Sequence, residues 1–462
     1  MLAHSVKTIE DVHGLLSERQ ADYVNVGFTD LAGQLRSKYV SKDKFLGALE
    51  RGIAMPLAAM ALDVGDTLRP VTGISVGDDM TFGDGLCHVV IDSCREIPWE
   101  NPRRNLLFLV EFEEPAEAPW HPRNVYRRVA AKAAQMALVP IHSCEYEFTL
   151  FDETPQSARA RNFRELRTAT EGKSYNLMLR QAVGVEFYGA LIECCKQLDV
   201  PLEGLHEEMG AGFMEAALAH CAGVRAADNA MLFKTFAKAL AQRNQRMMTF
   251  MARWSNGADG QSGHIHASLR DTSSGRGVFF KDSAEHRMST EMRFFIGGVQ
   301  RLLPEALLIL GPNPNSFRRF QPGIFAPIAS TWGWENRTCA IRAIGGTESS
   351  QRIECRVPGA DSNPYLAMAF VIGAGIWGIE HGIEPSPAFV GSVYEKAASV
   401  PAELRFPATF GAAINALEES RPAREIFGDR FVDAYVSCKR DQEADFASLV
   451  TDIELHRFFE FA

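Results

Sequence analysis

The chain has 462 residues, 46% of them hydrophobic, which is enough to build a large core in two or more domains. Its formal net charge of -10, without basic runs, argues against nucleic acid and anionic membranes as partners, and no stretch approaches the ~18 apolar residues of a membrane span. The nine cysteines are scattered without a CxxC pair, a pattern typical of free thiols in a reducing compartment, so we expect a cytoplasmic protein.

Strand patterns dominate the first hundred or so residues. Residues 23–40 predict a hairpin, because two alternating runs flank a glycine-containing turn. Residues 87–93 and 105–112 predict further strands. The segment 113–124 is rich in proline and acidic residues, which predicts a linker.

The rest of the chain mixes helices with short strands. Helical spacing extends over 125–138, and 141–152 predicts a strand. Longer helices are predicted at 186–198, 226–251 and 363–383. Because helices and strands do not alternate regularly, the pattern favours an α+β fold with a largely antiparallel sheet.

The strand at 141–152 carries two acids on one face. Side chains alternate along a strand, so Glu145 and Glu147 share a face, while Cys144, Tyr146 and Phe148 lie on the other. Two neighbouring carboxylates backed by apolar residues are unfavourable unless a cation lies between them. The alternative is a solvated sheet face, which is the commoner arrangement for one such pair considered alone.

Two later strands repeat this alternation. One face of the first carries His264, His266 and Ser268, and one face of the second carries Arg352, Glu354 and Arg356. Considered separately, the histidines could be ordinary surface or core residues and the second strand could be a ladder of salt bridges. Three such strands in one chain favour a shared polar site.

A further acidic pair, Glu207 and Glu215, flanks a glycine-containing turn, although each could simply be solvated. With them the candidate ligands are five glutamates and one histidine. Hard oxygen ligands with a single imidazole suit Mg²⁺ or Mn²⁺ better than zinc. Divalent ions with several arginines nearby are what phosphoryl transfer requires.

These segments, in this order, resemble the glutamine synthetase family over nearly the whole chain. The resemblance implies an N-terminal β-grasp domain at 1–115, followed by a catalytic domain at 116–462 with a curved antiparallel sheet and flanking helices. It implies ATP, L-glutamate and an amine as substrates, and two or more Mg²⁺ or Mn²⁺ ions per active site. It also implies a ring-shaped homo-oligomer, a dodecamer, with active sites between subunits.

The resemblance also assigns roles to residues. It places one metal among Glu147, Glu207 and Glu215, and the other among Glu145, His264 and Glu354. It assigns glutamate binding to Gly260, Arg319 and Arg356. It assigns the nucleotide to His266, Ser268, Arg337, Arg342 and Arg352. Three residues are expected to act in catalysis: Arg319, Arg337 and, as acceptor of the amine's proton, Glu207.

The sequence departs from ammonia-using family members around the acceptor. Leu57 lies in an apolar run where those members carry Asp-Gly-Ser-Ser, Phe325 replaces a glutamate of the loop that closes over the site, and Phe213 replaces a polar residue. Tyr175 matches a tyrosine beside the family's ammonium site. Because a buried methylene contributes ~0.8 kcal/mol, these four residues predict a pocket for an organic amine.

The predicted function is therefore an ATP-dependent γ-glutamyl amide synthetase. An alkylamine, arylamine or other monoamine is expected rather than a highly charged polyamine. One alternative is a glutamine synthetase that uses ammonia. Another is a non-catalytic family member that binds amine or glutamate.

Overall fold

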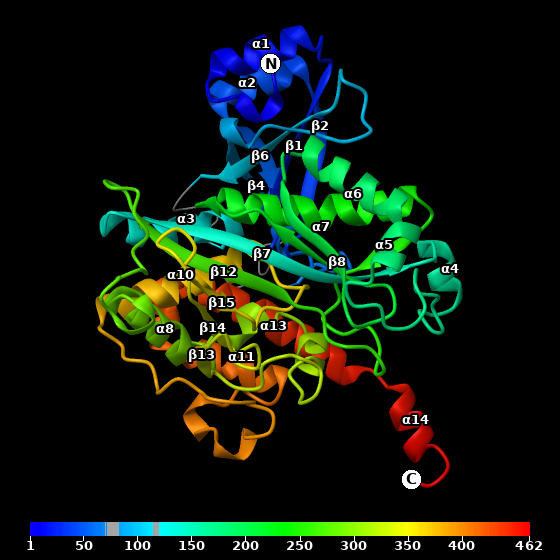
Figure 1. Cartoon of the computed structure of the whole chain (residues 1–462). Helices are drawn as coiled ribbons and strands as arrows, with labels where there is room; N and C mark the ends of the chain where they lie inside the picture. The colour runs from blue at the N-terminus through cyan, green and yellow to red at the C-terminus, as the bar shows by residue number, and fades with distance from the viewer. Residues whose placement is uncertain (70, 72–82, 114–119) are drawn as a thin grey trace.

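Two β-sheets organise the chain in the computed structural model, which describes residues 1–69, 71, 83–113 and 120–462 (Figure 1). The expected domain boundary after residue 115 and half of the expected linker at 113–124 fall on residues 114–119, outside the described residues. The division into domains 1–115 and 116–462 therefore stays a prediction.

The first sheet is built from the N-terminal hundred or so residues, in the order β2-β1-β6-β4-β3 with β5 beside β6. Its strands are β1 (Tyr23–Thr29), β2 (Leu35–Ser41), β3 (Ile53–Pro56), β4 (Asp84–Val89), β5 (Arg95–Glu96) and β6 (Leu106–Phe112). The predicted hairpin is confirmed as β1 and β2, and its turn contains Gly33 at φ +83°. The strand expected at 87–93 ends earlier, because the chain enters a 3₁₀ turn, η3 (Ile91–Ser93). The β-grasp assignment stays a prediction.

The second sheet has a central strand, β7 (Leu138–Phe151), that pairs with four others. Its described strands follow the order β13-β14-β15-β12-β7-β9-β8, with β10 and β11 also paired to β7. They are β8 (Leu202–Glu207), β9 (Phe213–Leu218), β10 (Cys221–Ala222), β11 (Met247–Thr249), β12 (Gly263–Asp271), β13 (Trp332–Trp334), β14 (Ile341–Ile344) and β15 (Arg352–Cys355). Among these strands every pair is antiparallel except β13–β14, as the α+β prediction expected.

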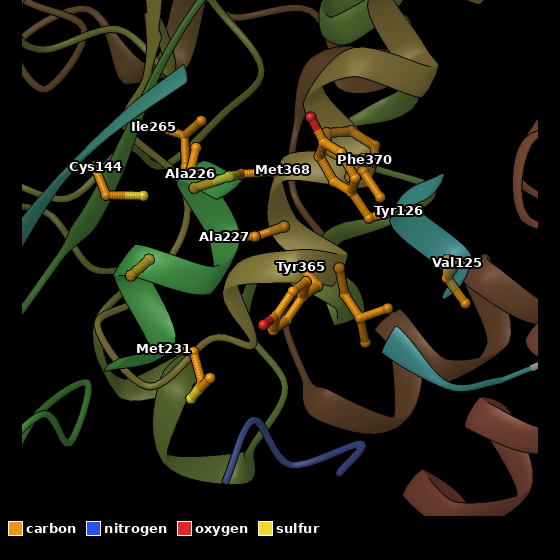
Figure 2. Close-up of a cluster of buried hydrophobic side chains, with 14 of the residues drawn as sticks. Val125, Tyr126, Cys144, Ala226, Ala227, Met231, Ile265, Tyr365, Met368 and Phe370 are labelled. Atoms are coloured by element: carbon orange, nitrogen blue, oxygen red, sulfur yellow. The ribbon is translucent and has the colours of Figure 1, made fainter. Parts of the chain in front are cut away.

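Helices α3 (Pro122–Gln135), α7 (Arg225–Arg243) and α10 (Pro364–Glu380) cover one face of this sheet. Cys144 of β7 and Ile265 of β12 lie beside Ala226, Ala227 and Met368 of these helices (Figure 2). This face is largely apolar, with His142 bonded to Tyr126 OH as an exception, and the side chains that alternate with Cys144 and Ile265 are directed to the opposite face.

The remaining helices surround these layers. They are α1 (Ile9–Glu18), α2 (Lys42–Arg51), α4 (Pro155–Ala160), α5 (Met178–Val183), α6 (Val185–Gln197), α8 (Thr290–Leu302), α9 (Leu307–Leu310), α11 (Phe410–Glu419), α12 (Arg421–Phe427), α13 (Asp429–Ser448) and α14 (Asp452–Phe458). Besides η3, the 3₁₀ turns are η1 (Ala3–Ser5), η2 (Leu57–Ala61), η4 (Glu285–Arg287), η5 (Pro314–Arg318), η6 (Ala397–Ser399) and η7 (Ala402–Leu404). In Figure 1, α14 projects away from the rest of the chain. In the described part of the chain, every helix is too short or too polar to cross a bilayer.

One predicted helix is wrong in extent. The pattern at 226–251 is helical only to Arg243, where α7 ends. Gln245 then takes a left-handed conformation, φ +56°, and the chain reverses. Met247–Thr249 forms β11 instead, because the open edge at the end of β7 offers backbone hydrogen-bond partners that a continued helix would leave unused. The other two long helices are confirmed as α6 and α10.

Candidate functional site

The face of the second sheet opposite the helices is polar; we name it the acidic face and define it by Glu145, Glu147, Glu215, His264 and Glu354. Strand register brings these residues together. Glu145 of β7 lies opposite His264 of β12, and Glu147 lies opposite Glu215 of β9. Glu354 of β15 lies opposite His266, two residues along β12 from His264.

His264 lies between two carboxylates. Its Nδ1 atom is 3.5 Å from Glu145 Oε2 and 3.4 Å from Glu354 Oε1. Both ring nitrogens are buried and have no hydrogen bond within the described residues. Burial opposes ionisation of Glu145, but His264 and His266 hold the pKa of this carboxyl well below its usual range. Glu145 is therefore ionised, and the buried imidazole of His264 beside it has ring nitrogens that make no hydrogen bond within the described residues. A cation site requires both features.

Glu215 lies among other acids. Burial, and then the negative charges of Glu147 and Glu145, raise the pKa of Glu215 to about 9. His206 Nε2 lies 2.9 Å from Glu208 Oε1 and 3.7 Å from Glu215 Oε1. Without a cation Glu215 is therefore protonated at neutral pH, and a bound cation would favour its ionised form.

Among the residues that the structure describes, three groups of side chains place their ligand atoms within 4.8 Å of one another. They are Glu145 with His266 and Glu354, Glu145 with Glu215 and His264, and His206 with Glu208 and Glu215. Glu145 and Glu215 each belong to two groups, so two or more cations would share ligands. Mostly carboxylate donors with imidazole fit Mg²⁺ or Mn²⁺.

The structure does not bring Glu207 to the acidic face. His206 lies opposite Glu215, so its neighbour Glu207 lies opposite Met214 and points to the reverse side of the sheet. There its carboxylate accepts hydrogen bonds from Ser174 Oγ and, at 3.3 Å, from Tyr188 OH. The expectation that Glu207 faces the other ligands is therefore wrong, and Glu208 lies among them instead. Period-two alternation around His206 would have separated the two glutamates, but the register with β9 is not visible in the sequence.

Two arginines bind Glu354. Arg342 Nη1 donates to Glu354 Oε2 at 3.0 Å, and Arg356 pairs with Oε1. Burial opposes ionisation, but Arg356 and the two histidines lower the pKa of Glu354 to about 2. Arg352 Nε donates to His266 Nδ1 at 3.0 Å, which leaves His266 Nε2 directed at Glu145, 3.1 Å away. Arg337 is exposed, between β13 and β14.

A cavity of about 260 Å³ adjoins these residues. It is lined by the predicted nucleotide residues His266, Ser268 and Arg352, together with Glu145. Its lining also includes polar residues that sequence reasoning missed: Ser143, Glu203, His220, Arg270, Ser349 and Ser350. Strand alternation beyond Ser268 indicates Arg270, whereas the others come together only through the fold.

Arg319 is 1% exposed and forms three hydrogen bonds. It donates to Val357 O at 2.7 Å, to Ser262 Oγ at 2.8 Å and to Arg356 O at 2.9 Å. Gly260 lies against it, because a Cβ atom there would come within 2.6 Å of Arg319 Cγ. Burial lowers the pKa of Arg319 to about 10, so it remains a cation at neutral pH.

Two of the four predicted acceptor-pocket residues lie beside the acidic face. The ring of Tyr175 meets that of His206 edge-on, with centroids 6.2 Å apart. Phe213 is two residues before Glu215 on β9 and shares its face. Phe325 is 57% exposed on the loop after Arg319. Leu57 of the same chain does not lie beside Tyr175 and Phe213, because it packs against Gly85 of the first sheet.

The chain matches a known protein family over most of its length. The family model described as "Glutamine synthetase, catalytic domain" matches residues 119–458. This chain belongs to the glutamine synthetase family. It is therefore an enzyme of the ligase class that forms C–N bonds, in a family that uses ATP and divalent metals.

Individual relatives differ in their acceptors. The chain is 32% identical to a γ-glutamylethanolamide synthetase, GlnA4, of Streptomyces coelicolor over 98% of this chain and 96% of the relative. It is 31% identical to a type-1 glutamine synthetase of Dictyostelium discoideum over 96% of this chain and 84% of the relative. The solved structure "Apo GmaS without ligand" is similar in fold, with a TM-score of 0.84 at 24% identity over 97% of this chain and 99% of that one.

Proposed function

We propose that this enzyme joins the γ-carboxylate of L-glutamate to an organic monoamine, forming a γ-glutamyl amide and releasing ADP and phosphate. The observation that carries the proposal is Phe213, an apolar side chain on the acidic face two residues from Glu215. The acidic face therefore has both carboxylates suited to divalent cations and an apolar side chain against which an amine's carbon substituent could bind.

The reaction divides into two steps. The γ-carboxylate of glutamate attacks the terminal phosphorus of ATP, ADP leaves, and γ-glutamyl phosphate forms. The unprotonated amine then attacks the acyl carbon, and phosphate leaves as the amide bond forms. No side chain serves as a covalent nucleophile.

We assign the cation-binding residues from their positions. Glu147, Glu208 and Glu215 would hold one Mg²⁺ or Mn²⁺ ion, and Glu145, His264 and Glu354 the other, with Glu208 replacing Glu207 in the predicted set. When bound, the ions would neutralise phosphate charge as it redistributes. Arg337, Arg342 and Arg352 would bind the nucleotide phosphates, with His266 and Ser268 lining the nucleotide cavity.

Glutamate binding is assigned to Gly260, Arg319 and Arg356. Arg319 would act through its charge and through the segments it holds, since its hydrogen bonds go to Ser262 and to the carbonyls of Arg356 and Val357. The proton lost by the amine would pass to His206 rather than to Glu207, because His206 lies beside Tyr175 on the acidic face.

We also propose a ring-shaped homo-oligomer, a dodecamer, located in the cytoplasm. The exposed side chains of Phe459 and Phe461, beyond α14, support an assembly that covers them. In such an assembly Leu57 and Phe325 would complete an acceptor pocket between subunits. The nine cysteines, eight of them buried, are compatible with a reducing compartment. Light scattering on the purified protein gives the subunit number.

The test of function is a comparison of acceptors. Initial rates of ADP release are measured with saturating ATP, glutamate and Mg²⁺, using ammonia, methylamine, ethylamine, isopropylamine, ethanolamine and putrescine. We expect kcat/KM to rise about fourfold for each methylene that the pocket buries, and a monoamine to exceed ammonia. A clear preference for ammonia would establish glutamine synthesis instead. Mass spectrometry of the product identifies the amide.

A further inference from the structure

Glu335 lies between β13 and β14 and has no role in the reaction above, although it binds one of the arginines proposed to hold phosphate. Arg342 Nε donates to Glu335 Oε2 at 3.0 Å, and Arg342 Nη2 donates to the same oxygen. The remaining nitrogen, Arg342 Nη1, donates to Glu354 Oε2 at 3.0 Å. All three nitrogens of this guanidinium group therefore donate to carboxylates.

The backbone at Glu335 determines where its carboxylate lies. Glu335 follows Trp334, the last residue of β13, which pairs with Ala343 of β14. It has a left-handed conformation, φ +48°, and its N–H donates to Ala343 O at 3.0 Å. A non-glycine residue persists in this region where the surrounding contacts require it. These contacts hold Glu335 beside the residue before Ala343, which is Arg342.

The residue after Glu335 is held as well. Asn336 Nδ2 donates to Phe389 O at 3.1 Å and to Gly391 O at 2.9 Å, and Asn336 Oδ1 accepts from Thr338 N at 3.0 Å. The chain is therefore bonded on both sides of Glu335. Its carboxylate needs only a rotation of the side chain to leave Arg342.

The contact between Glu335 and Arg342 is of a kind that a phosphate can replace. The side chain of Glu335 is 52% exposed and that of Arg342 is 14% exposed, so Glu335 forms the solvent-facing half of the pair. Two guanidinium nitrogens share one carboxylate oxygen, whereas the stronger arrangement gives each nitrogen an oxygen of its own. Exposed ion pairs also contribute little to stability. A phosphate brings several oxygens to the same edge and can displace the carboxylate.

We propose that Glu335 competes with the nucleotide for Arg342 and thereby weakens nucleotide binding. A phosphate that takes the Nε and Nη2 edge must replace the Glu335 carboxylate, while Nη1 stays bonded to Glu354. When ADP leaves, the carboxylate binds the guanidinium group again, which favours product release. This inference rests on the proposed function, because it needs Arg342 to bind a phosphate of the nucleotide.

The test is the affinity for a β,γ-methylene analogue of ATP, measured by titration calorimetry with Mg²⁺ and without glutamate. For Glu335→Gln we expect the dissociation constant to fall about two- to fivefold, the scale of one exposed ion pair. The KM for ATP should fall by a similar factor, and the KM values for glutamate and the acceptor should stay unchanged. Because salt screens an exposed pair, the difference from wild type should shrink in about 0.5 M KCl.

Two further variants separate the bond to Arg342 from general repulsion. Glu335→Asp keeps the charge and suits a left-handed backbone, but its reach is shorter by one methylene, so it should share most of the gain in affinity. Glu285→Gln is the matched control. The side chain of Glu285 is 92% exposed, and the ring of its neighbour His286 lies 4.5 Å from that of Trp334, centroid to centroid. This variant removes the same charge nearby and should bind the analogue as wild type does.

Arg342→Gln completes a double-mutant cycle with Glu335→Gln. Alone it should weaken binding of the analogue on the order of tenfold, and in its background E335Q should have almost no effect. Weaker binding in E335Q would overturn the inference, because Glu335 would then only hold Arg342 in place. Unchanged binding in E335Q, wild-type binding in E335D, or the same gain in E285Q would overturn it as well.

Failure of the proposed function looks different. If Arg342 binds no phosphate, R342Q leaves the affinity for the analogue unchanged, and the inference is overturned together with that assignment. If the enzyme prefers ammonia, every expected affinity stays the same, because the titration contains no acceptor.

Discussion

Glu147 on β7 and Glu215 on β9 are directly paired across neighbouring strands, so two carboxyl groups are held side by side by the pairing of the strands. Burial and the negative charge of Glu147 raise the pKa of Glu215, and keeping Glu215 protonated is part of the cost of folding without a cation. Removing one charge should therefore stabilise the metal-free protein and weaken metal binding. For Glu147→Gln we expect the midpoint of thermal unfolding without Mg²⁺ to rise on the order of 2 °C.

The same variant should gain less stability from added Mg²⁺ than wild type, since one proposed ligand is gone. Thermal unfolding with and without EDTA, at fixed protein concentration, measures both effects. Glu193→Gln is the control, because this exposed residue lies away from the acidic face. A lower midpoint without metal in E147Q, with unchanged stabilisation by Mg²⁺, contradicts the prediction.

Glu208 and Glu207 can be distinguished by metal binding. We expect Glu208→Gln to lower the affinity for Mn²⁺ by at least about tenfold and to reduce ADP release in proportion, since it removes a ligand atom. Glu207→Gln should leave Mn²⁺ affinity nearly unchanged, because its carboxylate lies on the reverse side of the sheet. Titration calorimetry with Mn²⁺ gives both affinities, and the opposite ranking would show that the side chains exchange positions in solution.

Phe213 should set the preference between ammonia and organic amines. Phe213→Gln replaces the apolar wall with an amide that can bind ammonium. We expect kcat/KM for an alkylamine to fall on the order of tenfold and the value for ammonia to rise. The variant Met214→Gln is a useful comparison, since Met214 lies on the other face and should not change the ratio. An unchanged ratio in F213Q rules out Phe213 as the selecting residue.

Lys234 gives the fold a pH dependence. Its ammonium group is buried against Tyr146 and Phe250 and donates to Ser362 O at 3.0 Å. Burial, reinforced by the charge of Lys238, lowers the pKa of Lys234 to about 7. Between pH 7 and about 10.4 the unfolded chain carries a proton that the folded chain has lost, so stability should rise with pH through this window.

The comparison variant is Lys234→Met, which fills similar space without a titrating group. Relative to K234M, the wild-type free energy of unfolding should increase by up to about 1.4 kcal/mol per pH unit above pH 7. Below pH 7 the difference should be constant. Urea unfolding at pH 6, 7, 8 and 9 and at one protein concentration measures it. Parallel pH profiles for the two proteins would show that Lys234 stays protonated.

Much of the site could be predicted from local sequence patterns. Period-two alternation correctly assigned Glu145 and Glu147 to the face opposite Cys144, Tyr146 and Phe148, because this part of β7 is regular and these three residues are buried in the core. The fold class followed from the irregular order of helices and strands. These features depend on residues close together in the chain, where side-chain periodicity carries the information.

The predictions that were wrong or incomplete concern residues whose positions depend on distant parts of the chain. Glu207 was misplaced because its face depends on the pairing of β8 with β9, which joins residues on both sides of a turn. The helix beyond Arg243 was lost to pairing of β11 with β7, almost a hundred residues earlier. The polar lining of the proposed nucleotide cavity, such as His220 and Ser350, comes from segments that meet only in the folded chain. Such non-local pairings have no periodic signature.

The proposed function divides the chemistry between two parts of the second sheet. The proposed activation of glutamate uses the central strands β7, β12 and β15. His206 and Phe213 lie on β8 and β9 at the border of this sheet, and the ring of Tyr175 contacts His206. Under this proposal, substitutions at that border would change which amine is accepted and would leave the residues assigned to phosphorylation unchanged. One fold can in this way yield enzymes with different amide products through substitutions at the β8–β9 border alone. Directed evolution of enzymes that use new amines should begin with residues at this border.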